Sequence, residues 1–398
     1  KRPFLSPEDR QQARQETTRK SAETLFKGLS LLRGTALKMA QQLSLETDLL
    51  PESACRELAK AYHQVPPINR ALVRKVVGKA LGKPPEKVFH RFDLTAFAAA
   101  SLGQVHYAED QDYQPLAVKI QYPGIARTIA SDVGLLRQLF RPLIQRDHLN
   151  PAIDELAARL SEEVDYLKEA EQVAYFAEHM KLAGVRTPTI KPRLSASTVL
   201  STTMMPGRPM DIWLKDNPCQ ADRDRIAQTL HNLFLAGLYE LNVIHADPNP
   251  GNFIIGDDLT VGLVDFGCVK RLKPDFVEDY RQLAVASAHH DNGAHFRLLI
   301  TLGFLPRDLA KVQMDAVRAL SDDLGDWFGR LYANDIFDFG AYPDFITDGK
   351  AILRHFHHLR RHFKMNPEFI FMDRTRYGLL RLFETMGARV KFRNPYEW

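Results

Sequence analysis

The stretch His245-Ala-Asp-Pro-Asn-Pro-Gly-Asn252 follows an apolar helical pattern and decides the fold. In it, Asp247 is followed five residues later by Asn252, a spacing that is typical of the catalytic loop of a phosphotransferase. At this spacing the aspartate can accept or orient a proton, and the asparagine can ligate a metal ion. The sequence therefore predicts a loop with the chemistry of phosphoryl transfer at the end of a helix.

A second acidic segment, Val264-Asp-Phe-Gly267, strengthens this interpretation. Its Asp265 comes thirteen residues after Asn252, at the expected end of a strand in a hairpin around Phe253–Val264. A carboxylate at such a strand end, just before a glycine, suits a magnesium ligand. The simpler interpretation is that both aspartates only form turns. It does not explain why the two segments occur in this order with a hairpin between them.

The composition excludes several classes of protein. Of the 398 residues, 45% are hydrophobic and 26% are charged, which is ordinary for a globular chain and excludes a disordered one. The 53 Lys and Arg residues exceed the 49 Asp and Glu residues by only 4, so we expect no nucleic-acid partner. The three cysteines, Cys55, Cys219 and Cys268, are odd in number and far apart, which indicates a reducing compartment.

No targeting or membrane-spanning segment is expected. No apolar run approaches the roughly 18 residues that cross a bilayer, and the first twenty residues lack the apolar core of a signal peptide. We expect a cytoplasmic protein, with a peripheral position at the inner face of a membrane as the alternative.

Composition shifts along the chain predict four regions. They are a polar tail (1–20), a helical extension (21–90), a small β-rich lobe (91–205) and a helical lobe (206–398). Strands are expected near Phe92 and at Gly103–Ala108, Leu116–Tyr122, Thr189–Arg193 and Thr198–Met205. Helices are expected over about 125–180, with a break near Asn150-Pro151, and from Asp222 to Leu241.

Lys119 stands in the otherwise apolar strand Leu116-Ala-Val-Lys-Ile120. A lysine there is costly to desolvate unless an anion meets it, and nucleotide phosphates together with a helix carboxylate would do so. The alternative is a lysine on an edge strand that reaches solvent.

The acidic segment Ser161–Glu169 can supply the carboxylate. If it is one helix, Asp165 and Glu169 share a face and repel each other, so cations are expected opposite them. Lys119 and Lys38 are the two candidates. The alternative is an acidic face that is simply solvated.

Together with the segment Ala98-Ala-Ala-Ser-Leu-Gly-Gln-Val-His106, these motifs resemble the UbiB/ADCK family of atypical protein-kinase-like ATPases over about residues 30–270. The resemblance implies an α+β fold of the bilobal protein-kinase type with an N-terminal helical extension, and it implies bound ATP or ADP with Mg²⁺. Where ordinary kinases have a glycine-rich loop over the phosphates, the family has an alanine-rich one, here Ala98, Ala99, Ala100 and Ser101.

The resemblance also implies a role for each site residue. Lys119 holds the phosphates and Glu169 orients it, Asp247 acts as general base or positions water, and Asn252 and Asp265 hold magnesium. Met204 and Met205 follow an expected strand and precede Pro206-Gly207, so their backbone is expected to meet the adenine at the hinge between the lobes. The alternative is that these methionines only pack in the core.

The helical extension is expected to cover the acceptor site. Apolar residues recur every three or four positions from Leu25 to Leu43, which places Lys38 and Gln41 together on the opposite face. By the resemblance, these two belong to a Lys-x-Gly-Gln motif that meets the Glu-x-Asp motif of Glu163 and Asp165.

Two departures from the family pattern stand out. Ala40 replaces the family's glycine in the extension motif, and Asn249 replaces a common histidine in the loop. A further segment, Arg354–His362, is interpreted as a basic surface helix; a metal site and a patch for anionic lipid are the alternatives.

Two classes of function stay open. The first is an ATPase or a kinase of small molecules or lipids that supports quinone or isoprenoid-lipid metabolism. Its partners would be the nucleotide, an isoprenoid lipid or quinone precursor, and a membrane surface. The second is a nucleotide-gated binding or scaffold module, a pseudokinase. The complete Lys119, Asp247, Asn252 and Asp265 set favours the enzyme.

Overall fold

The computed structural model describes residues 69–100, 102–140, 153–154, 157, 160–305, 311–356 and 366–398. The predicted tail and the leucine-striped helix of the extension lie outside them. The chain divides into two compact units. Unit 1 comprises Lys1–Glu171 and Ile190–Met204, and unit 2 comprises Gln172–Thr189 and Met205–Trp398.

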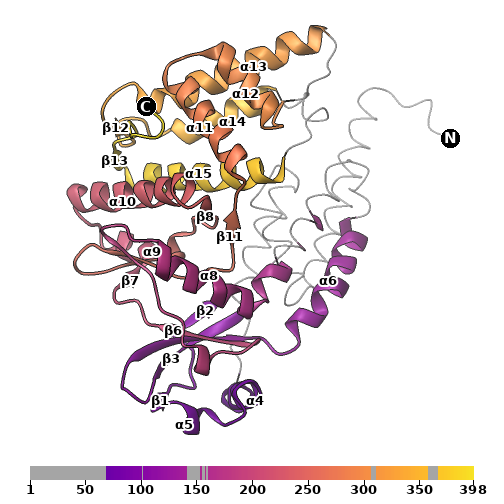
Figure 1. The fold of residues 1–398 in the computed structure, drawn as a ribbon, viewed down its shortest axis with the longest axis vertical. Helices are drawn as coiled ribbons and strands as arrows, with labels where there is room; N and C mark the ends of the chain where they lie inside the picture. Colours follow the sequence, from indigo (N-terminus) through magenta and orange to yellow (C-terminus); the bar gives the residue numbers. More distant parts are fainter. Residues whose placement is uncertain are drawn as a thin grey trace, which may run out of the picture. The chain divides into compact units, whose positions relative to one another are not determined.

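Unit 1 contains a five-stranded antiparallel sheet (Figure 1). Its strands are β1 (Arg91–Phe92), β2 (Ala98–Ala100), β3 (Gly103–Glu109), β4 (Pro115–Gln121) and β6 (Val199–Thr203). They follow the order β1-β3-β4-β6, and β2 also pairs with β3. Among the described residues of this unit, helices include α4 (Arg70–Leu81), α5 (Pro85–Val88), α6 (Ile125–Phe140) and the start of α8 (Tyr166–His179).

The alternation of β4 separates a core face from a polar face. Leu116, Val118 and Ile120 are fully buried on one side, where α4 contributes Val73 and Val77 to the same cluster. Because successive side chains of a strand point to opposite faces, the residue between Val118 and Ile120 is directed away from this core.

The predicted strand at Thr189–Arg193 is wrong. Ile190 forms a single bridge with Thr202, and the chain then enters the 3₁₀ turn η1 (Pro192–Leu194). Proline has no N–H to donate and a fixed φ, so the ladder cannot continue through Pro192.

Unit 2 is mainly helical. Its longer helices are the rest of α8, α9 (Met210–Lys215), α10 (Gln220–Tyr239), α11 (Pro274–Ala288), α12 (Asn292–Thr301), α13 (Lys311–Gly329), α14 (Phe345–His355) and α15 (Pro367–Met386). Its short elements are β5 (Val185–Arg186), β7 (Arg208–Pro209), β8 (Val243–His245), η2 (Pro250–Asn252), β9 (Phe253–Ile255), β10 (Val261–Leu263), β11 (Val269–Arg271), η3 (Arg330–Tyr332), β12 (Phe337–Asp338) and β13 (Arg389–Val390).

Helix α10 is the central element of unit 2. It packs against α15, β8 and β13, and Figure 1 shows α10 and α15 side by side. The predicted hairpin is present as β9 and β10, which extend into a four-stranded sheet with β5 and β7. Strand β8 precedes this hairpin in the sequence, and β11 follows it. The two strands pair with each other, so the segments before and after the hairpin are held together.

A buried ion pair ties α15 to the segment that follows β13. The guanidinium of Arg376 donates from Nη1 and Nη2 to the two carboxylate oxygens of Glu397 at 2.8 and 2.9 Å, with side chains 5% and 0% exposed. The hydroxyls of Tyr239 and Tyr332 also donate to Glu397, each at 2.6 Å.

The predicted α+β organisation, a sheet-rich part followed by a helical part, is confirmed. Of the helices the structure describes, none is both long and apolar enough to cross a bilayer.

Candidate active site

Lys119 of β4 meets a buried carboxylate. Its Nζ donates to both oxygens of Glu169 at 2.9 Å, and the two side chains are 13% and 2% exposed. The ammonium also lies 5.3 Å from the ring centre of Tyr166. Because β4 lies between β3 and β6, Lys119 is not on an edge strand, so the alternative of a lysine reaching solvent is wrong.

Asp165 caps α8 rather than sharing its face with Glu169. The helical residues 160–163 end at Val164, and α8 begins at Tyr166. The Oδ1 of Asp165 accepts from the backbone N–H of Lys168 at 3.1 Å, as an N-cap residue does. The expectation of one continuous acidic helix is therefore wrong, since an aspartate satisfies free N–H groups better at a helix start than inside a helix.

The cap has a consequence for Glu169, which falls in the first turn of α8. Carboxylates in a first turn are favoured by the positive end of the helix dipole. The break is fixed from the sheet as well, because Nε2 of Gln121 donates to the carbonyl of Val164 at 2.8 Å. Glu163 is half-buried just before the break.

The alanine-rich segment is a strand of a tight hairpin and not an open loop. Ala98, Ala99 and Ala100 form β2, with Ala100 opposite Gly103 of β3. A Cβ added to Gly103 would lie 2.2 Å from the carbonyl oxygen of Ile120, so only glycine fits there. Ala98 and Ala99 are exposed, and Ala100 is half-buried.

Three predicted site residues lie outside the described part of the chain. They are Lys38, Gln41 and Ser101. Residues 357–365, which contain most of the basic segment, also lie outside it.

In unit 2, the side chain of Asn252 holds Asp247. Nδ2 of Asn252 donates to Oδ2 of Asp247 at 2.7 Å and to its carbonyl at 3.4 Å. The carboxylate can only accept, which fixes the orientation of the amide and directs Oδ1 of Asn252 away from Asp247. Asn249 supports the turn by accepting from the N–H of Gly251 at 3.0 Å.

Asp265 has a left-handed backbone with φ of 60°, which is uncommon outside glycine. Its carbonyl accepts from Nε2 of His245 at 2.9 Å, and its Oδ1 accepts from the N–H of Gly267 at 3.3 Å. Because a carbonyl only accepts, Nε2 of His245 carries the proton. Such a conformation persists only where neighbours enforce it, and it marks Asp265 as a functional candidate.

Two residues that support this segment, His245 and Phe176, were not predicted from the sequence. The ring of Phe266 makes edge-on contacts with the rings of His245 at 5.6 Å and Phe176 at 5.3 Å. His245 is the first residue of the loop motif, and this position in the sequence could have indicated its role. Phe176 lies in an unremarkable apolar helix and gave none.

Met204 and Met205 mark the point where the chain passes from unit 1 to unit 2. The N–H of Met204 donates to the carbonyl of Pro115 at 3.0 Å. Just beyond, Gly207 has φ of 124°, and a Cβ there would lie 2.2 Å from the carbonyl oxygen of Ile255, so a side chain at this position is excluded.

The oxygen donors of unit 2 suit magnesium. Asn252 and Asp265 offer an amide and a carboxylate oxygen. No group of three or more His, Cys, Asp or Glu side chains that could hold a metal occurs within the described ranges. Magnesium usually binds through one or two carboxylates together with substrate phosphates and water. The donor set therefore fits a magnesium ion that is bound together with a nucleotide.

Comparisons with known proteins agree with these features. The family model described as ABC1 atypical kinase-like domain matches residues 60–297, more than half of the chain. Probable serine/threonine-protein kinase abkA of Dictyostelium discoideum is 28% identical over 328 residues, which cover 78% of this chain and 58% of that protein. Atypical kinase COQ8, mitochondrial, of Saccharomyces cerevisiae is 28% identical over 303 residues, 74% of this chain and 60% of that one.

A solved structure shares the fold. The complex of Rv3197 with erythromycin from Mycobacterium tuberculosis superposes with a TM-score of 0.65 at 22% identity, over 96% of each chain. The chain spans a little over half the length of the two curated relatives.

Proposed function

Because the chain belongs to the ABC1 atypical kinase-like family, we propose that it binds ATP or ADP with Mg²⁺ and that, when ATP is bound, it transfers the γ-phosphoryl group of ATP to water or to a small acceptor and releases ADP. The contact between Asn252 and Asp247 carries the enzymatic part of this proposal. It fixes a carboxylate in a loop and leaves an amide oxygen for a metal ion, the arrangement that phosphoryl transfer needs.

Each site residue has a role in this proposal. Lys119, oriented by Glu169, would donate to the nucleotide phosphates. A hydrogen bond from an ammonium group to a phosphate oxygen is charge-assisted and is stronger than one between neutral groups. Asp247 accepts the proton of the attacking hydroxyl or orients a water molecule. Asn252 and Asp265 hold the Mg²⁺, which neutralises charge on the phosphates.

The remaining site residues would shape the two ends of the nucleotide. The β2 strand with Ala98, Ala99, Ala100 and the following Ser101 would lie over the phosphates, in place of a glycine-rich loop. The backbone of Met204 and Met205 would meet the adenine.

The acceptor is proposed to be a quinone precursor or an isoprenoid lipid presented at a membrane surface. The resemblance to the UbiB/ADCK family and the relative named COQ8 support this class. Lys38 and Gln41 of the extension would face Glu163 and Asp165 and cover the acceptor site. In the alternative function, a nucleotide sensor, the same residues would bind nucleotide without turnover.

The Asp247→Asn variant separates the enzyme from the sensor. The amide is isosteric and can still accept from Asn252, so the loop should keep its shape. We expect ATP turnover to fall by at least about 100-fold, because the proton acceptor is lost. The affinity for Mg-ADP should stay within about threefold of wild type.

The matched control is Asp257→Asn, the same change at an exposed position of the β9–β10 turn, which should turn over ATP like wild type. Turnover is measured as phosphate release with and without anionic liposomes and a phenolic quinone precursor. Wild-type protein that binds Mg-ADP but shows no turnover under any of these conditions would favour the sensor.

A further inference from the structure

Gly378 of α15 touches the residue that follows the proposed proton acceptor. A Cβ added at Gly378 would lie 2.3 Å from Cγ of Pro248 and 3.3 Å from its Cβ. Carbon atoms pack at about 3.5–4.0 Å, so any side chain at position 378 must displace either α15 or the loop. Glycine in the middle of a helix is unfavourable by about 1 kcal/mol relative to alanine, so helix propensity does not explain its presence there.

Pro248 cannot yield to such a contact by rotating a side chain. Its ring is closed onto the backbone and fixes φ, so a displacement of the ring moves the peptide that carries Asp247. The loop is also internally tied, through Asn252 to Asp247 and through the N–H of Ala246 to the carbonyl of Cys268 at 2.8 Å. A displacement of Pro248 therefore shifts the whole loop.

Helix α15 is the more firmly held of the two partners. Arg376, two residues before Gly378, is bound at both terminal nitrogens to the buried Glu397 and donates to the hydroxyl of Tyr332 at 2.7 Å. At the end of the helix, Nε2 of Gln220 in α10 donates to the carbonyl of Gly387 at 2.8 Å. A clash at position 378 should therefore displace the loop and not α15.

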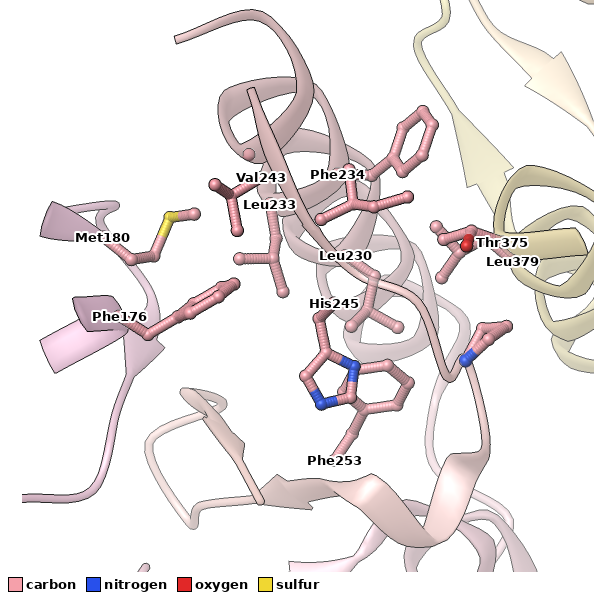
Figure 2. A pocket seen from close by; sticks show the side chains of 13 residues that line it. Phe176, Met180, Leu230, Leu233, Phe234, Val243, His245, Phe253, Thr375 and Leu379 are labelled. Atoms are coloured by element: carbon pink, nitrogen blue, oxygen red, sulfur yellow. The ribbon is translucent and has the colours of Figure 1, made fainter. Parts of the chain in front are cut away.

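The contact between Pro248 and α15 lies beside a small cavity. Pro248 borders a cavity of about 20 Å³, and Figure 2 shows Thr375 and Leu379 of α15 on one side of it and His245 and Phe253 on another. The contact with Gly378 is a point at which α15 lies directly against the loop.

We propose that Gly378 is a positioning residue for phosphoryl transfer. Helix α15 supports the loop that carries Asp247, and the lack of a side chain at position 378 lets this loop lie close enough to α15 to place Asp247 where it can act. This inference rests on the proposed function. It assigns a role to a helix that lies outside residues 60–297, the range that matches the family.

The test is Gly378→Ala. We expect kcat for ATP turnover to fall about 10-fold or more, because small displacements of a catalytic group are costly. The KM for ATP should stay within about threefold, since Lys119 and Asp265 lie on other segments. In the same variant, the amide protons of Ala246 and Asn252 should exchange with solvent at least about 10-fold faster.

A rescue variant follows from the geometry. Pro248→Ala removes Cγ and Cδ and leaves only the Cβ contact at 3.3 Å. In that background, Gly378→Ala should change kcat by less than about twofold, because the interaction between two contacting residues is non-additive.

Gly349→Ala is the matched control for a mere loss of stability. Its added Cβ would lie 2.6 Å from the ring of Trp327, away from the loop. It should lower the melting temperature but leave kcat and the exchange of the loop amides unchanged.

Three results would overturn the proposal. They are an unchanged kcat in Gly378→Ala, an equal loss of kcat in Gly349→Ala, and an effect of Gly378→Ala that is the same with and without Pro248. If the wild type shows no turnover at all, the proposed function fails. In that case the exchange rates of the loop amide protons, compared between Gly378→Ala and Gly349→Ala, still decide whether α15 positions the loop.

Discussion

Replacing Lys119 by methionine should weaken Mg-ADP binding by about 100-fold, the equivalent of about 2.7 kcal/mol for a charge-assisted hydrogen bond to phosphate. It should also lower the free energy of unfolding by about 3–5 kcal/mol, because the Glu169 carboxylate, 2% exposed, stays buried without this cation. Binding is measured by calorimetric titration, and stability by urea unfolding.

The double variant Lys119→Met/Glu169→Leu separates the two effects. Replacing a buried ion pair by apolar side chains is often neutral for stability, so the double variant should recover most of the lost free energy of unfolding. It should not recover nucleotide binding. Recovery of both would mean that Lys119 acts on the nucleotide only through the stability of unit 1.

Lys191→Met is the matched control within unit 1. Lys191 forms an ion pair with Asp110 at 2.9 Å, with side chains 27% and 10% exposed. Its loss should reduce stability but leave the affinity for Mg-ADP at the wild-type value. A comparable loss of affinity in this control would contradict a specific role of Lys119.

Arg376→Met should destabilise unit 2 by about 3–5 kcal/mol, because it leaves the Glu397 carboxylate buried without its cation. Burial by itself would raise the pKa of Glu397, but the Arg376 guanidinium and the hydrogen bonds from Arg376, Tyr239 and Tyr332 lower it to about 2. A carboxyl group with a depressed pKa stabilises the fold above its ordinary pKa of 4.5. This contribution is lost as the pH falls from 4.5 towards 2.

The control for this prediction is Arg389→Met, which removes an exposed pair with Asp338 whose side chains are 56% and 36% exposed. Exposed pairs contribute about 0–1 kcal/mol, so this variant should unfold close to wild type. Urea unfolding above pH 5 and again near pH 3 checks both the magnitude and the pH dependence. An Arg376→Met variant as stable as Arg389→Met would show that Glu397 does not depend on this arginine.

Much of unit 1 could be predicted from alternation along the strands. The expected strand Gly103–Ala108 ends one residue before β3 does, and the expected strand Leu116–Tyr122 is shifted by one residue from β4 at each end, because buried and polar residues alternate there. The strand expected at Thr189–Arg193 failed at Pro192, whose missing N–H was visible in the sequence. The helix start at Asp165 was missed because an acidic run hid a capping residue.

The candidate site was predictable where its chemistry is local. The spacing of Asp247, Asn252 and Asp265 depends on one loop and one hairpin, so it could be interpreted without a structure. The contacts of Gly378 with Pro248 and of Arg376 with Glu397 join segments that no pattern relates. The left-handed conformation of Asp265 likewise follows from its neighbours and not from its residue type.

The central claim is that the chain holds a magnesium-dependent nucleotide site, and thermal unfolding of the wild type with Mg-ADP or Mg-ATP tests it most directly. At about 100 times the dissociation constant, the ligand should stabilise the fold by about 2.7 kcal/mol, which raises the melting temperature by several degrees. Removal of Mg²⁺ with a chelator, or the Lys119→Met/Glu169→Leu double variant, should abolish the rise. A melting temperature that does not change with millimolar Mg-ADP or Mg-ATP, or that rises equally without magnesium, would contradict the claim.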